Sequence, residues 1–232
     1  MDYINYLVIA AAAYLLGSLS FSIIVCRLTT GKDIRSYGSG NAGLTNSFRV
    51  LGGSKTLLVL LGDTAKAAAA IYLGGYFAGM PGKLCAGIFV ILGHVFPVYF
   101  GFRGGKGVLV GATMLLFLDW RIFLTAFVLF VCAVAITRWI SLGSILGAVS
   151  FPISMHILYG DARMTAVAAL MSASVIYLHR SNIGRILHGC ENRFTLHGKP
   201  QISCDKKEEA RNENQRFRQR RLGDSPCNPA AP

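Results

Sequence analysis

The feature that most limits the fold of this chain is a series of seven apolar runs with few charged residues. They cover approximately residues 4–25, 55–78, 84–101, 107–120, 122–137, 142–160 and 163–178. A helix needs about 20 mostly apolar residues to cross a bilayer. Only 15% of the 232 residues are charged, whereas soluble domains carry about 25%. The sequence therefore excludes a soluble globule and predicts an all-α integral membrane protein with seven transmembrane helices.

Two of the runs need separate interpretation. The fourth and fifth are short and share the break Asp119-Trp120-Arg121, which fits a tight helical hairpin or one long kinked element; we predict the hairpin. The first run follows an acidic start without basic residues and is too long for a signal peptide core. It is therefore expected to be a retained helix rather than a cleaved signal.

The distribution of Lys and Arg predicts the orientation. With seven spans, 19 of these residues fall on the side of the C-terminus and three on the other side, Lys83, Arg121 and Arg163. Because cationic loops stay in the cytoplasm, the N-terminus is expected outside and the C-terminus in the cytoplasm. The long loops rich in Gly, Asn, Ser and cations then all lie on the inner face. A functional site with short interfacial helices is expected there.

The first of these inner loops is Gly38-Ser39-Gly40-Asn41-Ala42-Gly43-Leu44-Thr45-Asn46-Ser47-Phe48-Arg49. Such a segment can turn successive backbone N–H groups toward one anion, although glycine content alone also fits a flexible linker. Thr45 or Asn46 could cap a short helix whose first turn carries Arg49. The loop therefore predicts a phosphate site with a guanidinium group.

The second inner loop is Phe102-Arg103-Gly104-Gly105-Lys106-Gly107, preceded by Gly93-His94-Val95-Phe96-Pro97. Glycines around one lysine allow the backbone to approach a ligand while the ammonium meets it as a point charge. The spacing does not match a Walker A loop. An interfacial lysine anchor is the alternative interpretation. His94 is expected to pack and to hydrogen-bond the backbone rather than to act as a base.

The third inner loop runs from Leu178 to Glu191 and contains His179, Asn182 and Arg185. Its stretch 181–189 repeats the pattern of 45–53, with an arginine four residues after Ser181 as after Thr45. The short repeat predicts two capped helix starts that face one another across a doubly anionic site.

Within the spans, Asp63 and Lys66 lie one helical turn apart and are expected to pair, because an unpaired charge at the bilayer centre costs roughly 2.5–3.5 kcal/mol. Ser144 lies near the inner surface and could donate to a ligand, although small residues in membrane helices usually pack. The stretch from His156 to Asp161 spells the H-x-x-x-x-D of thioester-dependent acyltransferases. It falls on the outer face, where coenzyme A is absent, so we do not assign it a role.

Taken together, the three inner loops resemble the three cytoplasmic motifs of the bacterial acyl-phosphate:glycerol-3-phosphate acyltransferases, the PlsY family. The similarity extends over about residues 5–197. It implies transfer of a fatty acyl group from acyl phosphate to the sn-1 hydroxyl of glycerol 3-phosphate, giving lysophosphatidate and phosphate, in a bacterial inner or plasma membrane. The sequence departs from the family pattern at Ser181, at Ala67 and in its basic tail.

The loops and the resemblance together give the expected site. Its catalytic residues are Ser39, Lys106 and His179, and its substrate-binding residues are Gly40, Asn41, Asn46, Arg49, Gly104, Gly105, Gly107, Ser144, Asn182 and Arg185. Arg49 and Asn182 are expected on glycerol phosphate, and Lys106 with the glycine N–H groups on the acyl phosphate. The proton of the attacking hydroxyl could go to His179 or to the phosphate of the donor.

The expected partners are glycerol 3-phosphate, a long-chain acyl phosphate and membrane lipid. The resemblance also allows a contact with the enzyme that makes acyl phosphate. No cofactor, metal or nucleic acid is expected, and the six cysteines contain no C-x-x-C pair. Residues 1–199 are expected to form the membrane domain and 200–232 a basic, disordered cytoplasmic tail. A transporter of small organophosphates is the alternative function, but transporters bind their substrates near the membrane midplane.

Overall fold

The computed structural model describes residues 3–195, and all of its regular elements are helical. They are α1 (Tyr3–Gly17), α2 (Phe21–Thr30), η1 (Ile34–Ser36), α3 (Leu44–Leu51), α4 (Gly53–Val95), η2 (Val98–Phe100), α5 (Val108–Leu118), α6 (Trp120–Thr137), α7 (Ile140–Tyr159), α8 (Ala162–Leu178) and α9 (Arg180–Leu187). The expected tail, residues 200–232, lies outside the described residues.

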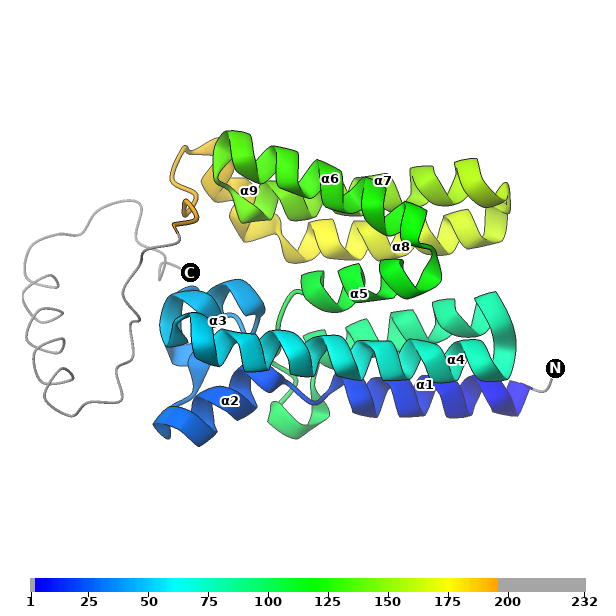
Figure 1. Ribbon diagram of the computed structural model, residues 1–232, viewed down its shortest axis with the longest axis horizontal. Helices are drawn as coiled ribbons and strands as arrows, with labels where there is room; N and C mark the ends of the chain where they lie inside the picture. Colours follow the sequence, from blue (N-terminus) through cyan, green and yellow to red (C-terminus); the bar gives the residue numbers. More distant parts are fainter. Residues whose placement is uncertain (1–2, 196–232) are drawn as a thin grey trace, which may run out of the picture.

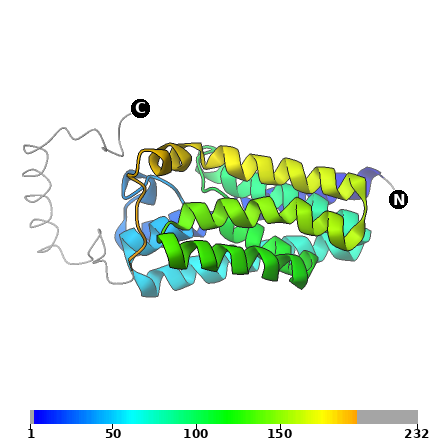
Figure 2. The same cartoon turned by 90° about the horizontal axis from the view of Figure 1, so that it is seen from above.

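The long helices run along one axis and form two layers (Figure 1). One layer contains α1 and α4, and the other contains α6, α7 and α8, which lie side by side in Figure 2. Helix α5 lies between the layers and packs on both α4 and α6. A single apolar core joins them, with Ile71 from α4, Met114 from α5, Ile122 from α6 and Met155 from α7 fully buried.

Helix α4 is a helical hairpin rather than one straight rod. Its backbone leaves the helical region at Ala78 and at Gly79, where φ is +56°, a conformation that glycine adopts without a steric penalty. Lys66 and His94 are 28 residues apart, yet their side-chain nitrogens are 3.2 Å apart; along an unbroken helix they would be about 42 Å apart. The two halves of α4 therefore correspond to the predicted spans 55–78 and 84–101.

The break at Asp119 separates α5 from α6. Asp119 is in an extended conformation, and its carboxylate accepts a hydrogen bond of 2.8 Å from the backbone N–H of Arg121, which caps α6. Helix α6 then returns along α5 (Figure 1). The predicted hairpin is thus confirmed, and the long kinked alternative is not formed.

The first predicted span is not one continuous helix. Helix α1 ends at Gly17 and α2 begins at Phe21. The carbonyl of Leu19, in the break, accepts a hydrogen bond of 2.5 Å from the ammonium of Lys66. This contact supplies the partner that the Leu19 carbonyl would otherwise have inside a helix. The run 4–25 is therefore interrupted at residues 18–20, and Tyr3–Thr30 as a whole is still long and apolar enough to cross a membrane.

Several helical segments are long and apolar enough to cross a membrane. Within residues 3–195, four segments pass by length and composition: Tyr3–Thr30, Gly53–Phe100, Trp120–Thr137 and Ile140–Tyr159. A fifth is formed if Ala162–Leu178 and Arg180–Leu187, which meet at 58°, count as one bent span. Large apolar side chains such as Phe127, Val128 and Val131 are exposed along α6. An exposed apolar face of this length is expected in contact with lipid.

Candidate active site

The three inner loops meet at one end of the bundle, opposite the start of α1 (Figure 1). Arg35 joins the first loop to the second, since its guanidinium donates to the carbonyls of Phe100, at 2.6 Å, and Arg103, at 2.9 Å. Asp33 holds this guanidinium through a 2.8 Å ion pair, and Arg35 in turn keeps the pKa of the Asp33 carboxyl well below its usual range. Arg35 was not among the site residues expected from the sequence.

The first loop is held by the side chain of Asn46. Its Oδ1 accepts the N–H of Ser39 at 2.8 Å, and its Nδ2 donates to the carbonyls of Tyr37, at 3.1 Å, and Asn41, at 3.0 Å. Asn46 is buried, whereas Ser39 and Gly40 are exposed at the loop surface. Asn46 therefore shapes the loop and leaves Ser39 exposed at its surface.

The short helix after this loop forms as predicted, but its cap is different. The N-cap of α3 is Gly43, and no side chain caps the helix, because Asn46 lies inside α3. Arg49 is in the last turn of α3 rather than the first. The N-cap of α9 is His179, again without a side-chain cap. The expectation of two side-chain-capped helix starts is therefore wrong. At α3, the Asn46 side chain forms hydrogen bonds with the loop before the helix and does not cap the helix.

The second loop lies against the end of α4. The N–H of Gly104 donates to the carbonyl of Val95 at 3.0 Å, and the N–H of Gly105 donates to that of His94 at 3.1 Å. A Cβ atom on Gly104 would lie 2.0 Å from the carbonyl oxygen of His94, so only glycine allows this approach. The expectation that these two N–H groups face an anion is wrong, since both are donated within the chain.

Lys106 links the second loop to the third. Its ammonium donates a hydrogen bond to Oδ1 of Asn182, at the start of α9. The Nδ2 of Asn182 donates in turn to Oε1 of Glu191 at 2.7 Å. Arg185 completes the group with a 2.8 Å ion pair to Oε2 of Glu191. The structure thus brings together Lys106, Asn182 and Arg185, which were expected from the sequence. They lie around Glu191, which was not.

Glu191, like Arg35, was not among the site residues expected from the sequence. Besides Asn182 and Arg185, it accepts a hydrogen bond of 2.8 Å from the hydroxyl of Ser141, in the first turn of α7. The signal was present, because Glu191 is an isolated acid at the end of a loop rich in cations. Ser144, which had been selected instead of Ser141, donates to the carbonyl of Ile140 in its own helix at 2.9 Å.

The site carries more positive than negative charge. Burial, together with the nearby Arg185 and Arg180, lowers the pKa of Lys106 to about 8, although Glu191 opposes the shift. Burial also lowers the pKa of Arg49, which interacts with both Glu191 and Arg185. Burying a charge without compensation is unfavourable. A bound anion would provide the compensation that Glu191 alone cannot give to Arg49, Lys106 and Arg185.

His179 lies at the junction of α8 and α9 and is 3% exposed. Its Nδ1 is 2.8 Å from the carbonyl oxygen of Val175. Because a carbonyl can only accept, Nδ1 carries the proton in a neutral imidazole, and the lone pair is on Nε2. The ring interacts electrostatically with Lys106 and Glu191. His179 is therefore near the cationic group with a basic nitrogen available.

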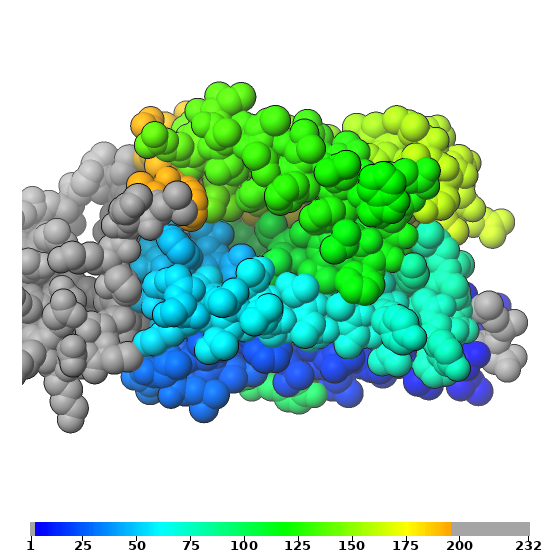
Figure 3. All heavy atoms as spheres, in the orientation of Figure 1, coloured from blue at the N-terminus to red at the C-terminus, as the bar shows by residue number. Residues whose placement is uncertain are grey.

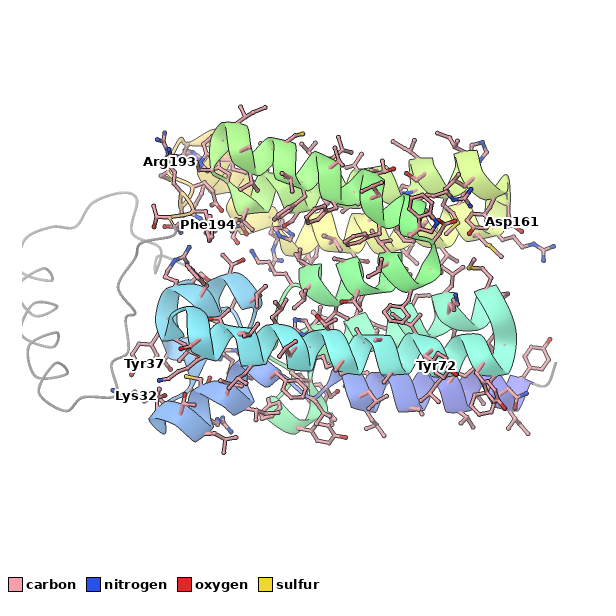
Figure 4. All side chains as sticks on the ribbon, in the orientation of Figure 1. Lys32, Tyr37, Tyr72, Asp161, Arg193 and Phe194 are labelled. Atoms are coloured by element: carbon pink, nitrogen blue, oxygen red, sulfur yellow. The ribbon has the colours of Figure 1, made fainter. Side chains whose placement is uncertain are left out.

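The other sequence assignments divide clearly. Asp63 and Lys66 form a 2.7 Å ion pair, which confirms the predicted pairing. His156 and Asp161 lie at the opposite end of the bundle; Figure 4 shows Asp161 far from Arg193 and Phe194, which mark the site end. Asp161 accepts the backbone N–H groups of Arg163 and Met164 and so caps α8. Within the stretch 156–161, Asp161 therefore has a structural role as the cap of α8.

The site end is also open at its side. The space-filling view shows a hollow between α3 and the helices α6 and α7 (Figure 3). Residue Phe194, which follows the third loop, returns to this region, since its N–H donates to the carbonyl of Arg138 at 2.8 Å and its ring is 5.7 Å from that of Phe48. The cationic group is therefore bordered by apolar side chains on this side.

Comparison with known proteins identifies the family. The family model described as glycerol-3-phosphate acyltransferase matches residues 7–189. A glycerol-3-phosphate acyltransferase of Clostridioides difficile (strain 630) is 42% identical over 200 residues, covering 84% of this chain and 98% of the relative. That of Chlorobaculum parvum is 38% identical, covering 83% and 98%.

Solved structures give the same answer. The crystal structure of PlsY, an integral membrane glycerol 3-phosphate acyltransferase, in its glycerol 3-phosphate form matches with a TM-score of 0.77 at 33% identity, covering 82% of this chain and 96% of that chain. The lysophosphatidic acid form matches with a TM-score of 0.75 at 31% identity, covering 83% and 97%. With its helical membrane fold and its cationic site, the chain belongs to the glycerol-3-phosphate acyltransferase family of PlsY.

Proposed function

We propose that this chain transfers a fatty acyl group from an acyl phosphate to the sn-1 hydroxyl of glycerol 3-phosphate, without coenzyme A. The observation that carries the proposal is the half-buried cationic group of Arg49, Lys106 and Arg185 near one buried carboxylate, Glu191. Both substrates carry a phosphate, and one also carries an alkyl chain. The cationic group bordered by apolar side chains fits both requirements, and the glycerol 3-phosphate acyltransferase activity of the relatives supports the same substrate class.

The chain's contribution to the reaction is positioning and charge stabilisation. Arg49 binds the phosphate of glycerol 3-phosphate, and Asn182 and the exposed Ser39 orient the ligands. Lys106 lies on the acyl phosphate and stabilises the charge that develops as phosphate departs. An acyl phosphate is an activated mixed anhydride, so a protein nucleophile is unnecessary once the hydroxyl is held against the acyl carbon.

In the transfer step the hydroxyl oxygen of glycerol 3-phosphate bonds to the acyl carbon. The bond between that carbon and the phosphate oxygen breaks, and its electron pair leaves with the phosphate. The hydroxyl proton goes to Nε2 of His179 or to the departing phosphate. The products are lysophosphatidate and inorganic phosphate.

The proposal includes seven crossings, with the N-terminus outside and the site on the cytoplasmic face of a bacterial inner or plasma membrane. The support is the alternation in direction of α1, the two halves of α4, α5, α6, α7 and α8. The excess of cations at the end where the loops meet agrees with that orientation. Residues 1–199 are the membrane domain, and residues 200–232, rich in Lys and Arg, are a tail outside it. Loss of turnover on truncation after Gly198, in a folded protein, would contradict this division.

The test is turnover by the purified protein in detergent. With acyl phosphate and glycerol 3-phosphate, lysophosphatidate and phosphate should form in equal amounts, and acyl coenzyme A should not replace acyl phosphate. Folded protein without turnover would overturn the proposal. Flux of glycerol 3-phosphate into sealed vesicles in the absence of an acyl donor would favour a transporter instead.

A further inference from the structure

A buried polar unit, consisting of Asp63, Lys66 and His94, lies beneath the second loop and takes no part in the mechanism above. The three side chains are 1%, 4% and 3% exposed. The ammonium of Lys66 is 2.7 Å from Oδ1 of Asp63 and 3.2 Å from Nδ1 of His94. Asp63 and Lys66 come from the first half of α4, and His94 comes from the end of the second half.

The ammonium of Lys66 has a full set of partners. It can donate three hydrogen bonds, and it has three acceptors: Asp63, His94 and the carbonyl of Leu19, at 2.5 Å. These come from its own helix, the other half of α4 and the break between α1 and α2. Because each of its three donors has an acceptor, the ammonium ties these three elements together. The His94 ring is therefore held at one edge from within the bundle.

The opposite edge of the ring lies against Gly105. Because an ammonium can only donate, Nδ1 of His94 accepts, and the proton of the neutral ring is on Nε2. An atom at the Cβ position of Gly105 would lie 2.3 Å from this Nε2. The carbonyl of His94 also accepts the N–H of Gly105 at 3.1 Å. One residue thus contacts Gly105 through its backbone and through its ring.

We propose that His94 is a positioning residue for Lys106. The Asp63–Lys66 pair fixes the ring, the ring fixes Gly105, and Gly105 sets the direction in which the next residue, Lys106, extends toward Asn182. His94 itself is buried and acts through the loop rather than on substrate. This inference rests on the proposed function, in which Lys106 lies on the acyl phosphate.

The first test removes the hold on the ring without leaving an unpaired charge. Replacing a buried ion pair by apolar residues of similar volume usually preserves folding, so the double variant Asp63→Leu/Lys66→Met should be recovered intact. We expect its kcat to fall at least tenfold, with a smaller change in KM for glycerol 3-phosphate, which Arg49 binds separately. Wild-type kcat in the folded double variant would overturn the proposal.

The pH profile separates positioning from mere packing. In the wild type Lys106 has a pKa of about 8 because it is buried, so activity that needs its charge falls above that pH. When the loop is no longer held, Lys106 gains solvent and its pKa rises toward the ordinary value. The basic limb of kcat/KM should therefore move to higher pH in the double variant. An unmoved limb would overturn the proposal even if the rate falls.

Two substitutions of His94 provide a second, independent comparison. Asn places a polar atom where Nδ1 lies and leaves space above Gly105, whereas Gln can place its amide where Nε2 lies. We expect His94→Asn to lose at least tenfold in kcat, and His94→Gln, which keeps the contact with Gly105 but not the one with Lys66, to lose less than His94→Asn. Equal losses in the two variants, matched by equal losses of thermal stability, would make His94 a packing residue and overturn the proposal.

Two controls complete the design. Tyr159→Phe removes a 2.8 Å hydrogen bond to Asp119 at the opposite end of the bundle and should leave kcat and the pH profile unchanged. Lys106→Met tests the proposed function itself. If that variant is folded and fully active, the assignment of Lys106 fails; if it is inactive while the His94 and ion-pair variants behave as wild type, only the positioning role fails.

Discussion

Lys106 donates a hydrogen bond to the side-chain oxygen of Asn182, 76 residues further along the chain. This contact joins the loop after α4 to the start of α9, and Glu191 holds the other side of the Asn182 amide at 2.7 Å. The contact brings the cationic ends of two inner loops to one point. The following predictions test what each member of this group does.

The pH dependence of the reaction should report Lys106. Its pKa is lowered to about 8 by burial, so the ammonium loses its proton as pH rises through 8, and kcat/KM should fall about tenfold between the plateau and pH 9. Lys106→Arg keeps the charge at that pH and should lack this limb, with a lower kcat because the guanidinium must fit beside Gly105. A limb that persists unchanged in Lys106→Arg would assign it to another group.

Arg49→Lys tests geometry rather than charge. A planar guanidinium can bind a phosphate through two parallel hydrogen bonds, which an ammonium cannot reproduce. The value of kcat/KM for glycerol 3-phosphate should fall at least tenfold, or about 1.4 kcal/mol of transition-state binding, and the KM for acyl phosphate should change less. Arg163→Lys, exposed at the far end of the bundle, is the control without effect. Near wild-type kinetics for Arg49→Lys would make Arg49 an interfacial anchor.

Glu191→Gln removes a charge and keeps the shape of the side chain. Because the Glu191 carboxylate raises the pKa of Lys106, its loss should move the basic limb of the pH profile below 8. Loss of the charged contact with Arg185 should also lower the free energy of unfolding by about 1.5–3 kcal/mol, measured by thermal unfolding in detergent. Asp161→Ala, which removes the α8 cap at a cost of about 1 kcal/mol, should lower stability without moving the limb. A shift to higher pH in Glu191→Gln would contradict this electrostatic picture.

His179→Ala decides between the two acceptors of the proton. Removal of a general base lowers kcat by about 100-fold or more, and that loss is expected if Nε2 of His179 takes the proton. His188→Ala is a matched control, since the exposed His188 makes the same kind of Nδ1 contact, 2.7 Å to the carbonyl of Gly184, outside the cationic group. A loss of less than about fivefold in His179→Ala would assign the proton to the donor phosphate.

Thiol labelling in intact cells tests the orientation. Ala162→Cys, at the end of the bundle away from the site, should react with an impermeant reagent. Asn41→Cys, in the first inner loop, should react only after the membrane is opened. The unsubstituted chain measures labelling of the native cysteines. Reaction of position 41 from outside would reverse the proposed orientation.

Much of the architecture could be predicted from local pattern. The hairpin at Asp119 followed from a charged break between two apolar runs, and the pairing of Asp63 with Lys66 followed from their spacing on one helix face. The short helix that contains Arg49 was also expected, although its cap was not. The break at Leu19 was missed because its cause, the ammonium of Lys66, is 47 residues away.

The site could be predicted only in part, because partners that are distant in the sequence also determine the roles of its residues. The sequence contained Ser39, Lys106 and Asn182 in glycine-rich or cationic loops, which marked them as candidates. It could not reveal that the Asn46 amide forms hydrogen bonds with the first loop, or that the Glu191 carboxylate pairs with Arg185 in the third loop. Such roles depend on which partner reaches a buried donor, and residue type alone does not state this.

The sequence by itself determined that the chain is a helical membrane protein with its cations and glycines gathered in three loops, because hydropathy and charge are properties of each local segment. The tertiary structure decided how those loops are used. The N–H groups of Gly104 and Gly105 donate to carbonyls at the end of α4, whereas the Lys106 ammonium donates to Asn182. The physical reason is that most buried donors and acceptors need a partner, and in a folded bundle that partner often comes from a distant segment of the chain.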